Sequence, residues 1–329
     1  MRCDTLVSAV PGPRPDPPLI SIVVPVLDEE DCVEELARRV REAMAGGGAR
    51  YEILFVDDGS RDRTPERVAE LHKADPATVG TLRFTRSFGH QAALAAGLRH
   101  ARGDAVVSMD GDLQHPPELL PTLIDAWRGG ADVVNTVRRL PPGAARSLKE
   151  RTAHVFYRVM AALASVPVIP AGADFRLLDR RAVDAFNALE ERSLYARGLI
   201  PWLGFPETRV EYEVADRYAG RSKYGLWPML RLALDGIFSF SVLPLRLISI
   251  LGLVTTLFGV GFGVFALVAH LSGGVVASGW TSVVVLILVF GGVQLLSIGI
   301  LSEYVGRVYA EVKRRPRYVI ESQSEPDSP

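Results

Sequence analysis

Two long runs without a charged residue constrain the fold of this chain more than any other feature. The first extends from Leu247 to Leu271 and the second from Trp280 to Ser302, and neither contains Asp, Glu, Lys or Arg. Each run exceeds the roughly 20 residues that a helix needs to cross about 30 Å of hydrocarbon. The link between them, SGGVVASG, is short. We therefore expect a transmembrane hairpin. A pair of buried core helices is the alternative, which two such runs in tandem disfavour.

The charges that flank these runs predict their orientation. Arg246 precedes the first run, and the link contains no Lys or Arg. The basic residues that follow the second run are Arg307, Lys313, Arg314, Arg315 and Arg317. Because Lys and Arg are retained on the cytoplasmic side, both termini and the large N-terminal region are expected in the cytoplasm. The chain is thus predicted to be a multi-pass protein of the cell (inner or plasma) membrane.

Both ends of the chain are predicted to be disordered. The first segment, MRCDTLVSAVPGPRPDPP (residues 1–18), is proline-rich and lacks the sustained apolar core of a signal peptide. The last segment, ESQSEPDSP, is polar and contains few residues that could build a core.

Overall composition excludes two classes of protein. Lys and Arg number 37 against 38 Asp and Glu, a formal net charge of −1, whereas a nucleic-acid-binding protein usually has a basic excess. The two cysteines, Cys3 and Cys32, are too few for a disulfide framework and lack metal-ligand spacing. We expect no nucleic-acid partner and a reducing compartment.

Up to about Gly225 the chain alternates apolar strands with helical patterns. The strands are predicted at Ser21–Val26, Tyr51–Val56, Thr81–Thr85, Asp104–Met109 and Ala131–Val137. Helices are predicted over Asp31–Ala45, from Thr64 with Pro65 at its first turn, and over His90–Ala101. Continuous apolar strands that alternate with helices indicate an α/β fold with a mostly parallel sheet flanked by helices.

Acidic clusters follow three of these strands. They are Asp28-Glu29-Glu30, Asp57-Asp58 and Asp110-Gly111-Asp112. Ligands of such sheets bind beyond the carboxyl ends of the strands, where gathered carboxylates repel one another unless a cation neutralises them. No GxGxxG follows the first strand and no GxxxxGK[ST] occurs, so a divalent ion, Mg²⁺ or Mn²⁺, is the expected route to a nucleotide diphosphate. Tight turns capped by Asp and Ser are the alternative for these clusters.

An ordered set of motifs resembles a known enzyme family. PVLDEE, VDDGSRDRT, FGHQAALAAGL, MDGDLQHPPE, ADFRLLDRRA and RYAGRSKYG, with the paired apolar runs, resemble the polyisoprenyl-phosphate glycosyltransferases of family 2. The resemblance covers about Leu19 to Arg317. It implies a GT-A-like fold and a metal-dependent, inverting hexosyltransferase. Such an enzyme moves a sugar from a nucleotide-sugar to a polyprenyl phosphate, to supply cell-envelope glycosylation.

The resemblance also implies roles for individual residues. Asp110 and Asp112 match the metal-binding DxD motif, and Asp112 and Asp174 are the expected catalytic residues. The residues expected to bind the nucleotide-sugar are Pro25, Asp28, Glu30, Asp58, Asp110 and Gln114. Relatives often have Asn where this chain has Asp28 and an aromatic residue where it has Leu27.

The acceptor phosphate is expected to meet basic side chains. Arg217, Arg221 and Lys223 lie in the segment that meets this phosphate in relatives, and we add Arg138 and Arg151. Residues 226–245 are interpreted as an amphipathic helix at the interface of the lipid bilayer. An ordinary helix packed on the catalytic domain is the alternative.

The predicted organisation has six parts. They are an arm (1–18), a catalytic domain (19–225), the interfacial segment (226–245), two spans (246–271 and 280–303) and a cytoplasmic basic tail (304–329). Relatives suggest a homo-oligomer. The sugar stays open: glucose from UDP is preferred, and a GDP-mannose-dependent synthase or an aminoarabinose transferase is the alternative. A polysaccharide synthase would carry Gln-x-x-Arg-Trp and more spans, and a degenerate transferase could serve as a membrane scaffold.

Overall fold

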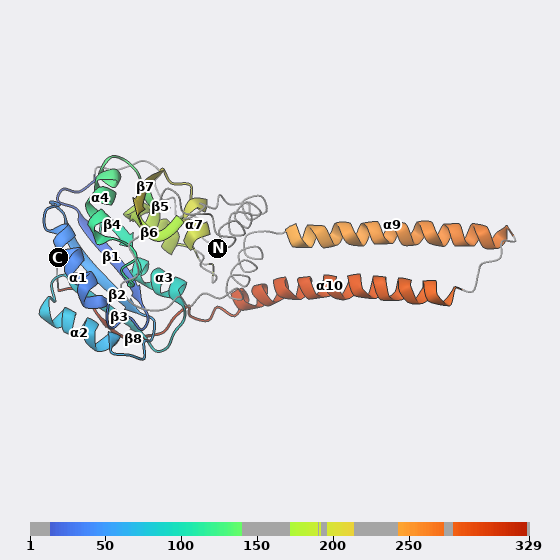
Figure 1. The fold of residues 1–329 in the computed structure, drawn as a ribbon, viewed down its shortest axis with the longest axis horizontal. Helices are drawn as coiled ribbons and strands as arrows, with labels where there is room; N and C mark the ends of the chain where they lie inside the picture. The colour runs from blue at the N-terminus through green and yellow to red at the C-terminus, as the bar shows by residue number, and fades with distance from the viewer. Residues whose placement is uncertain are drawn as a thin grey trace. The chain divides into compact units, whose positions relative to one another are not determined.

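The computed structural model describes residues 14–139, 172–189, 191, 196–213, 243–272 and 279–327. The described elements fall into two compact units (Figure 1). One unit holds the sheet, its helices and the last strand of the chain, and the other holds the two long apolar helices.

The first unit is built on an eight-stranded sheet. Its strands, in spatial order, are β7 (Glu207–Glu213), β5 (Val133–Arg139), β6 (Gly172–Asp179), β4 (Ala105–Ser108), β1 (Leu19–Val26), β2 (Arg50–Asp57), β3 (Val79–Phe84) and β8 (Ile320–Ser324). Strands β4, β1, β2 and β3 are parallel, as are β5 and β7, whereas β6 and β8 run antiparallel to their neighbours. The predicted mostly parallel α/β fold is confirmed.

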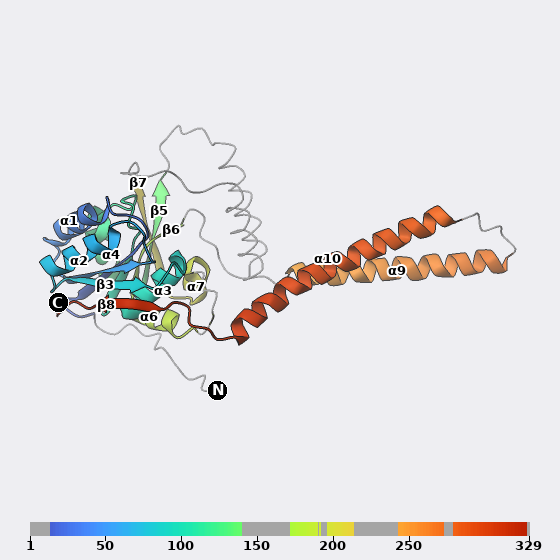
Figure 2. The ribbon, with the colours of Figure 1, turned by 90° about the horizontal axis from the view of Figure 1, so that it is seen from below.

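Helices cover both faces of this sheet (Figures 1 and 2). They are α1 (Val33–Met44), α2 (Thr64–Ala74), α3 (His90–His100), a 3₁₀ turn η1 (Pro117–Leu119), α4 (Leu120–Arg128), α6 (Arg180–Asn187) and α7 (Ala196–Trp202). The predicted strands and helices of residues 21–137 all form, with ends that differ by a few residues.

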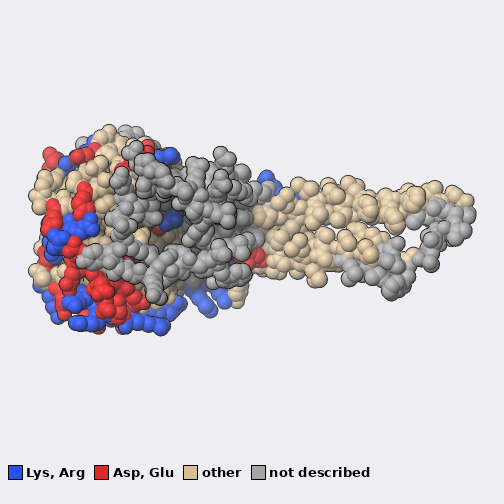
Figure 3. All heavy atoms as spheres, in the orientation of Figure 1, with Lys and Arg blue, Asp and Glu red and all other residues tan. Residues whose placement is uncertain are grey.

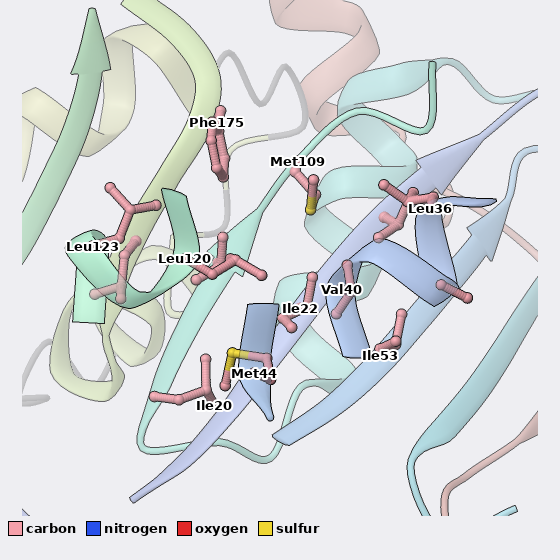
Figure 4. Packing of buried hydrophobic residues seen from close by; sticks show 14 of the residues in the cluster. Ile20, Ile22, Leu36, Val40, Met44, Ile53, Met109, Leu120, Leu123 and Phe175 are labelled. Atoms are coloured by element: carbon pink, nitrogen blue, oxygen red, sulfur yellow. The ribbon is translucent and has the colours of Figure 1, made fainter. Parts of the chain in front are cut away.

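The central strand β1 is buried on both faces. Ile20 and Ile22 pack with Leu36 and Val40 of α1 in the main hydrophobic cluster, which Figure 4 shows from close by. Val23 points the other way, toward α3. Side chains of a strand alternate between the two faces, so each face of β1 packs against its own layer of helices, and residues 22–26 are all apolar for that reason.

The C-terminal tail is ordered, contrary to the prediction from the sequence. We predicted that ESQSEPDSP is disordered, but Ile320–Ser324 forms β8, which pairs antiparallel with β3. Polar residues serve here because β8 is an edge strand whose backbone pairs with β3 while its side chains face solvent. The hydrophobic pattern that predicts buried strands is therefore absent.

The opposite end of the chain is also more ordered than predicted. The arm predicted over residues 1–18 ends in contacts with the sheet, because the Arg14 guanidinium lies 3.4 Å from Asp132 and 3.8 Å from Asp179. It also lies 4.7 Å from the ring centroid of Trp127. Residues 1–13 lie outside the described residues.

The second unit consists of α9 (Leu243–Leu271) and α10 (Trp280–Val312). Within them, Pro244–Phe265 and Val285–Val312 are long and apolar enough to cross a membrane, and neither stretch is buried. On the face shown in Figure 3 the described atoms of these helices are almost entirely uncharged. The predicted spans lie within the two helices, whereas residues 226–242 of the predicted interfacial segment lie outside the described residues.

Gly97 in α3 allows this helix to approach β1, and we predict that enlarging it is destabilising. A Cβ on Gly97 would lie 2.1 Å from Cγ1 of Val23, so Gly97→Ala overpacks a buried contact and lowers the free energy of unfolding by about 1–3 kcal/mol. Thermal unfolding of the detergent-purified protein measures this change. Gly46→Ala is the matched control, since a Cβ there meets nothing within 4 Å; equal effects of the two substitutions would contradict the packing argument.

Candidate active site

The candidate site lies at the edge of the sheet where the parallel strands end. The segments after β1, β2, β3 and β4 all leave the sheet at this edge. Strand β6 runs in the opposite direction and begins there, because Ser108 at the end of β4 pairs with Arg176. The hydroxyl of Ser108 donates to the carbonyl of Asp174. The fold therefore brings Asp174 to the edge that carries the acidic clusters.

The first two acidic segments bind each other. The backbone N–H of Arg61 donates to Oδ1 of Asp28 (2.9 Å), and that of Arg63 donates to Glu30 (3.1 Å). In return, the backbone N–H of Asp28 donates to the Ser60 hydroxyl (3.0 Å). Asp28 and Glu30, predicted to bind the nucleotide, thus also hold two loops together.

Asp28 has a left-handed backbone, with φ of 55°. Among residues other than glycine, Asn and Asp adopt this conformation most readily. The exchange of Asn for Asp at this position, noted above for relatives, is consistent with that backbone.

Asp58 is a buried anchor for the segment between β3 and α3. One carboxylate oxygen accepts from the backbone N–H of Phe88 (2.6 Å), and the other accepts from the N–H of Gly89 (2.9 Å) and the hydroxyl of Ser87 (2.7 Å). The residue is only 3% exposed. Its carboxylate shapes the site by ordering this segment, which is a role that the sequence alone did not predict.

Gly59 is required beside this anchor. Its φ is +76°, and a Cβ would lie 2.6 Å from the backbone carbon of Arg86. The close approach of the two segments therefore depends on the absence of a side chain.

The DxD segment is held by its own backbone. The N–H of Asp110 donates to Nδ1 of His115 (3.0 Å), and the N–H of Gln114 donates to Oδ1 of Asp112 (3.1 Å). Leu113 between them is buried and left-handed, with φ of 60°. A strained residue other than glycine is kept only where the surroundings fix it, so this turn holds both carboxylates in set positions.

Asp174 is the most strongly paired carboxylate of the site. The Arg197 guanidinium binds it with two hydrogen bonds, at 2.8 and 2.9 Å. Arg176 lies 3.5 Å away, and Nε2 of His90 lies 3.4 Å from Oδ2 of Asp174. The same His90 nitrogen lies 3.6 Å from Oδ1 of Asp110. His90 thus connects the DxD segment with Asp174.

These contacts set the ionisation of both groups. Burial raises the pKa of Asp174, but hydrogen bonds from His90 and Arg197 and the guanidinium charges outweigh it and hold that pKa well below its usual range. Burial lowers the pKa of His90, but the hydrogen bond to Asp174 and the charge of Asp110 raise it above its ordinary value. Asp174 is therefore a carboxylate at neutral pH and a poor proton acceptor.

The acidic pair fits a small divalent cation. Among the described residues, no group of three or more His, Cys, Asp or Glu side chains could hold a metal alone. Mg²⁺ usually binds to one or two carboxylates and completes its shell with phosphate oxygens and water. The Asp110 side chain is 34% exposed and Asp112 is half-buried, so both carboxylates are accessible to such an ion.

Of the other predicted site residues, two are described by the structure and four are not. Pro25 lies in β1 next to this edge, and Arg138 lies near the end of β5, in register with Tyr212. Arg151, Arg217, Arg221 and Lys223 lie outside the described residues. Their proposed contacts with the acceptor phosphate stay predictions, as do the ligand contacts of the whole predicted set.

Sequence reasoning missed Arg197, Arg176 and His90 as site residues. His90 and Arg176 stand inside the motifs FGHQ and ADFRL, and we predicted only a helix start for the former; α3 does begin there. Arg197 lies in α7 and belongs to none of the quoted motifs. Only its contact with Asp174 identifies it.

We predict that Arg197→Gln makes stability depend less strongly on pH, because it reduces the lowering of the Asp174 pKa. Asp174 has a lowered pKa in the folded state, so its pairing stabilises the protein above the unfolded pKa of about 4, and this stabilisation is lost as the pH falls. The substitution should cost about 1–3 kcal/mol near pH 7, since it leaves a buried carboxylate with fewer donors, and less near pH 4. Thermal unfolding at several pH values measures the difference.

Arg209→Gln is the matched control, because Arg209 forms an exposed pair with Glu207 and should change stability by less than about 0.5 kcal/mol. A cost for Arg197→Gln that does not vary with pH would contradict the ion pair as its source.

Comparison with known proteins shows the family. Residues 21–186 match the family model described as glycosyl transferase family 2. A glycosyltransferase of Synechocystis is 40% identical over 92% of this chain and 94% of its own length. The SfII prophage-derived bactoprenol glucosyl transferase of Shigella flexneri is 42% identical over 92% of this chain and 97% of its own. A prophage bactoprenol glucosyl transferase homolog of Escherichia coli is 40% identical over 92% and 98%. The chain therefore belongs to glycosyl transferase family 2 and is a glycosyltransferase.

Proposed function

We propose that this enzyme transfers a hexose, glucose from UDP-glucose, to a polyprenyl phosphate such as undecaprenyl or decaprenyl phosphate. The observation that carries the proposal is similarity along nearly the whole chain to proteins named bactoprenol glucosyl transferase. The similarity includes the region of the two apolar helices, which suit an enzyme with a lipid acceptor. The lipid-linked sugar would serve cell-envelope glycosylation.

The donor would bind at the edge that carries the carboxylates. Asp110 and Asp112 would hold Mg²⁺ or Mn²⁺, which when bound supplies charge stabilisation for the departing diphosphate. The other residues proposed for the donor site are Pro25, Asp28, Glu30, Asp58 and Gln114. The contacts described above support a division of roles, because Asp58 orders the β3–α3 segment while Asp28 and Glu30 join the loops beside it.

The nucleophile would be an oxygen of the acceptor's phosphate group. A polyprenyl phosphate is ionised at neutral pH, so its oxygen can attack C1 of the sugar on the face opposite the diphosphate. One C–O bond forms at C1 as another breaks, and the electron pair leaves with the diphosphate. No proton has to move. Basic side chains would neutralise and position the acceptor, and Arg138, Arg151, Arg217, Arg221 and Lys223 are proposed for this task.

Asp174 would act by charge and position. Its low pKa and its two hydrogen bonds from Arg197 make it a weak base. A carboxylate held ionised can stabilise the positive charge that develops on the sugar, or orient a sugar hydroxyl. The reaction described above does not require a base, so the weak basicity of Asp174 is compatible with it.

The two apolar helices would span the cell membrane as a hairpin, with the catalytic domain and both termini in the cytoplasm. A homo-oligomer is also proposed. Gly252, Gly259 and Gly263 in α9 would allow close helix contact.

The purified full-length protein should make a lipid-linked hexose from UDP-glucose and undecaprenyl phosphate in the presence of Mg²⁺ or Mn²⁺. Mass spectrometry of the lipid product measures this, with UDP-galactose, UDP-N-acetylhexosamine, GDP-mannose and an aminoarabinose donor as parallel arms. Chelation should abolish the product and added metal should restore it. Asp110 and Asp112 are negatively charged, so only a bound cation can neutralise the departing diphosphate. Transfer to a soluble sugar but not to the lipid phosphate would overturn the proposed acceptor, and metal-independent transfer would overturn the metal site.

Asp174→Asn should lower kcat by about 10²–10³-fold, the size expected when one electrostatic contact to a developing charge is removed. The Kd for UDP with Mg²⁺ should change little, since the substitution keeps the shape of the side chain. Turnover assays and calorimetric titration of UDP measure the two quantities on the same preparation. Equal losses in turnover and nucleotide affinity would contradict the proposed role.

A further inference from the structure

The tail that follows α10 is bound along β3 in the catalytic unit. Beside the β8–β3 pairing, the backbone N–H of Thr85 donates to the carbonyl of Val319 (3.1 Å). The N–H of Asp327 donates to the carbonyl of Pro76 (2.9 Å). The tail is thus attached beyond both ends of β3, and one attachment reaches the segment that Asp58 orders.

Aromatic contacts join the tail to that segment. The ring of Tyr318 stacks on Phe84, with centroids 4.9 Å apart and an interplanar angle of 13°. Phe84 in turn meets Phe88 edge-to-face at 5.7 Å, and the Arg86 guanidinium lies 3.9 Å from the centroid of Phe88. Stacked and edge-to-face pairs each add to the stability of such a layer. Tyr318 therefore supports the residues whose backbone N–H groups bind Asp58.

A chain of charges makes a second connection. Arg83 lies 3.1 Å from Glu321 of β8 and 3.4 Å from Asp57 at the end of β2. Asp57 also accepts from the backbone and the hydroxyl of Ser60. Arg83 thus links the tail to the VDDGS segment.

These residues border an open cleft of about 520 Å³. It is lined by Leu27 and Asp28 after β1, by Gly59 and Ser60 after β2, by Arg86 and Ser87 after β3, and by Glu321. Small-molecule sites typically enclose about 300–1,000 Å³. The cleft lies beyond the carboxyl ends of β1, β2 and β3, and the DxD segment after β4 is to one side of it.

We propose that the C-terminal tail forms a wall of the donor site. The cleft receives the nucleoside of the nucleotide-sugar, and Glu321 accepts a hydrogen bond from it. Glu321 is 51% exposed in its side chain, and its second oxygen makes no hydrogen bond within the described part of the chain. A nucleoside offers O–H and N–H donors, and a carboxylate accepts them strongly. Tyr318 is a positioning residue, which acts through Phe84 and Phe88.

This inference rests on the proposed function, since it requires a nucleotide-sugar donor. It adds that donor binding depends on residues beyond the second apolar helix, outside the residues 21–186 that match the family model.

Calorimetric titration of the full-length protein in detergent with UDP and Mg²⁺ tests the proposal. Glu321→Ala and Glu321→Gln should raise the Kd about tenfold, the effect of losing a charged hydrogen bond. Gln323→Ala is the matched control on the same strand, because Gln323 does not line the cleft, and it should leave the Kd unchanged. Thermal unfolding of each variant verifies that the fold is kept.

A second pair of variants tests the positioning role. Tyr318→Ala should weaken UDP binding, whereas Tyr318→Phe, which keeps the stacked ring, should bind UDP as the unaltered protein does. If the unaltered protein binds UDP and the Glu321 variants bind it equally well, the inference is overturned and the proposed function is left intact. Unaltered protein that binds neither UDP nor GDP with Mg²⁺ would overturn both.

Discussion

Mutual repulsion of carboxylates is the constraint on which the rest of this site depends. The parallel strands deliver acidic residues to one edge of the sheet, and each of them needs donors that hold it in place. The structure supplies these donors in different ways. Asp58 is bound by backbone N–H groups of the β3–α3 segment, Asp174 is bound by Arg197, and Asp28 is bound by the loop after β2. Asp110 and Asp112 are the pair proposed above to bind a divalent cation.

The donors also connect the loops. The carboxylates of one loop accept hydrogen bonds from backbone N–H groups of a neighbouring loop. The geometry of each loop is therefore set by another loop rather than by its own sequence. His90 shows this most clearly, since its ring lies close to both Asp110, which follows β4, and Asp174 in β6. A change in one segment is therefore expected to displace the others.

Part of this arrangement could be predicted from the sequence. Apolar strands that alternate with helices predicted the order of elements from β1 to β5, and the position of Asp110 and Asp112 directly after a strand predicted the edge on which they lie. The partners of each carboxylate could not be predicted, because hydrogen bonds between distant segments leave no periodic signal. Arg197 and Glu321 are the clearest cases, since both lie far along the chain from the residues that they contact. β8 was missed because an edge strand needs no apolar face.

The position of β8 also has a consequence for the order in which the protein is made. The ribosome completes β3 long before it reaches Ile320, and both apolar helices are synthesised in between. Until the tail emerges, the outer edge of β3 has unpaired backbone groups, which invite pairing with other chains. The catalytic sheet therefore reaches its full width only after the helices have been synthesised. Synthesis that stops at α10 would leave the edge of β3 without its partner strand.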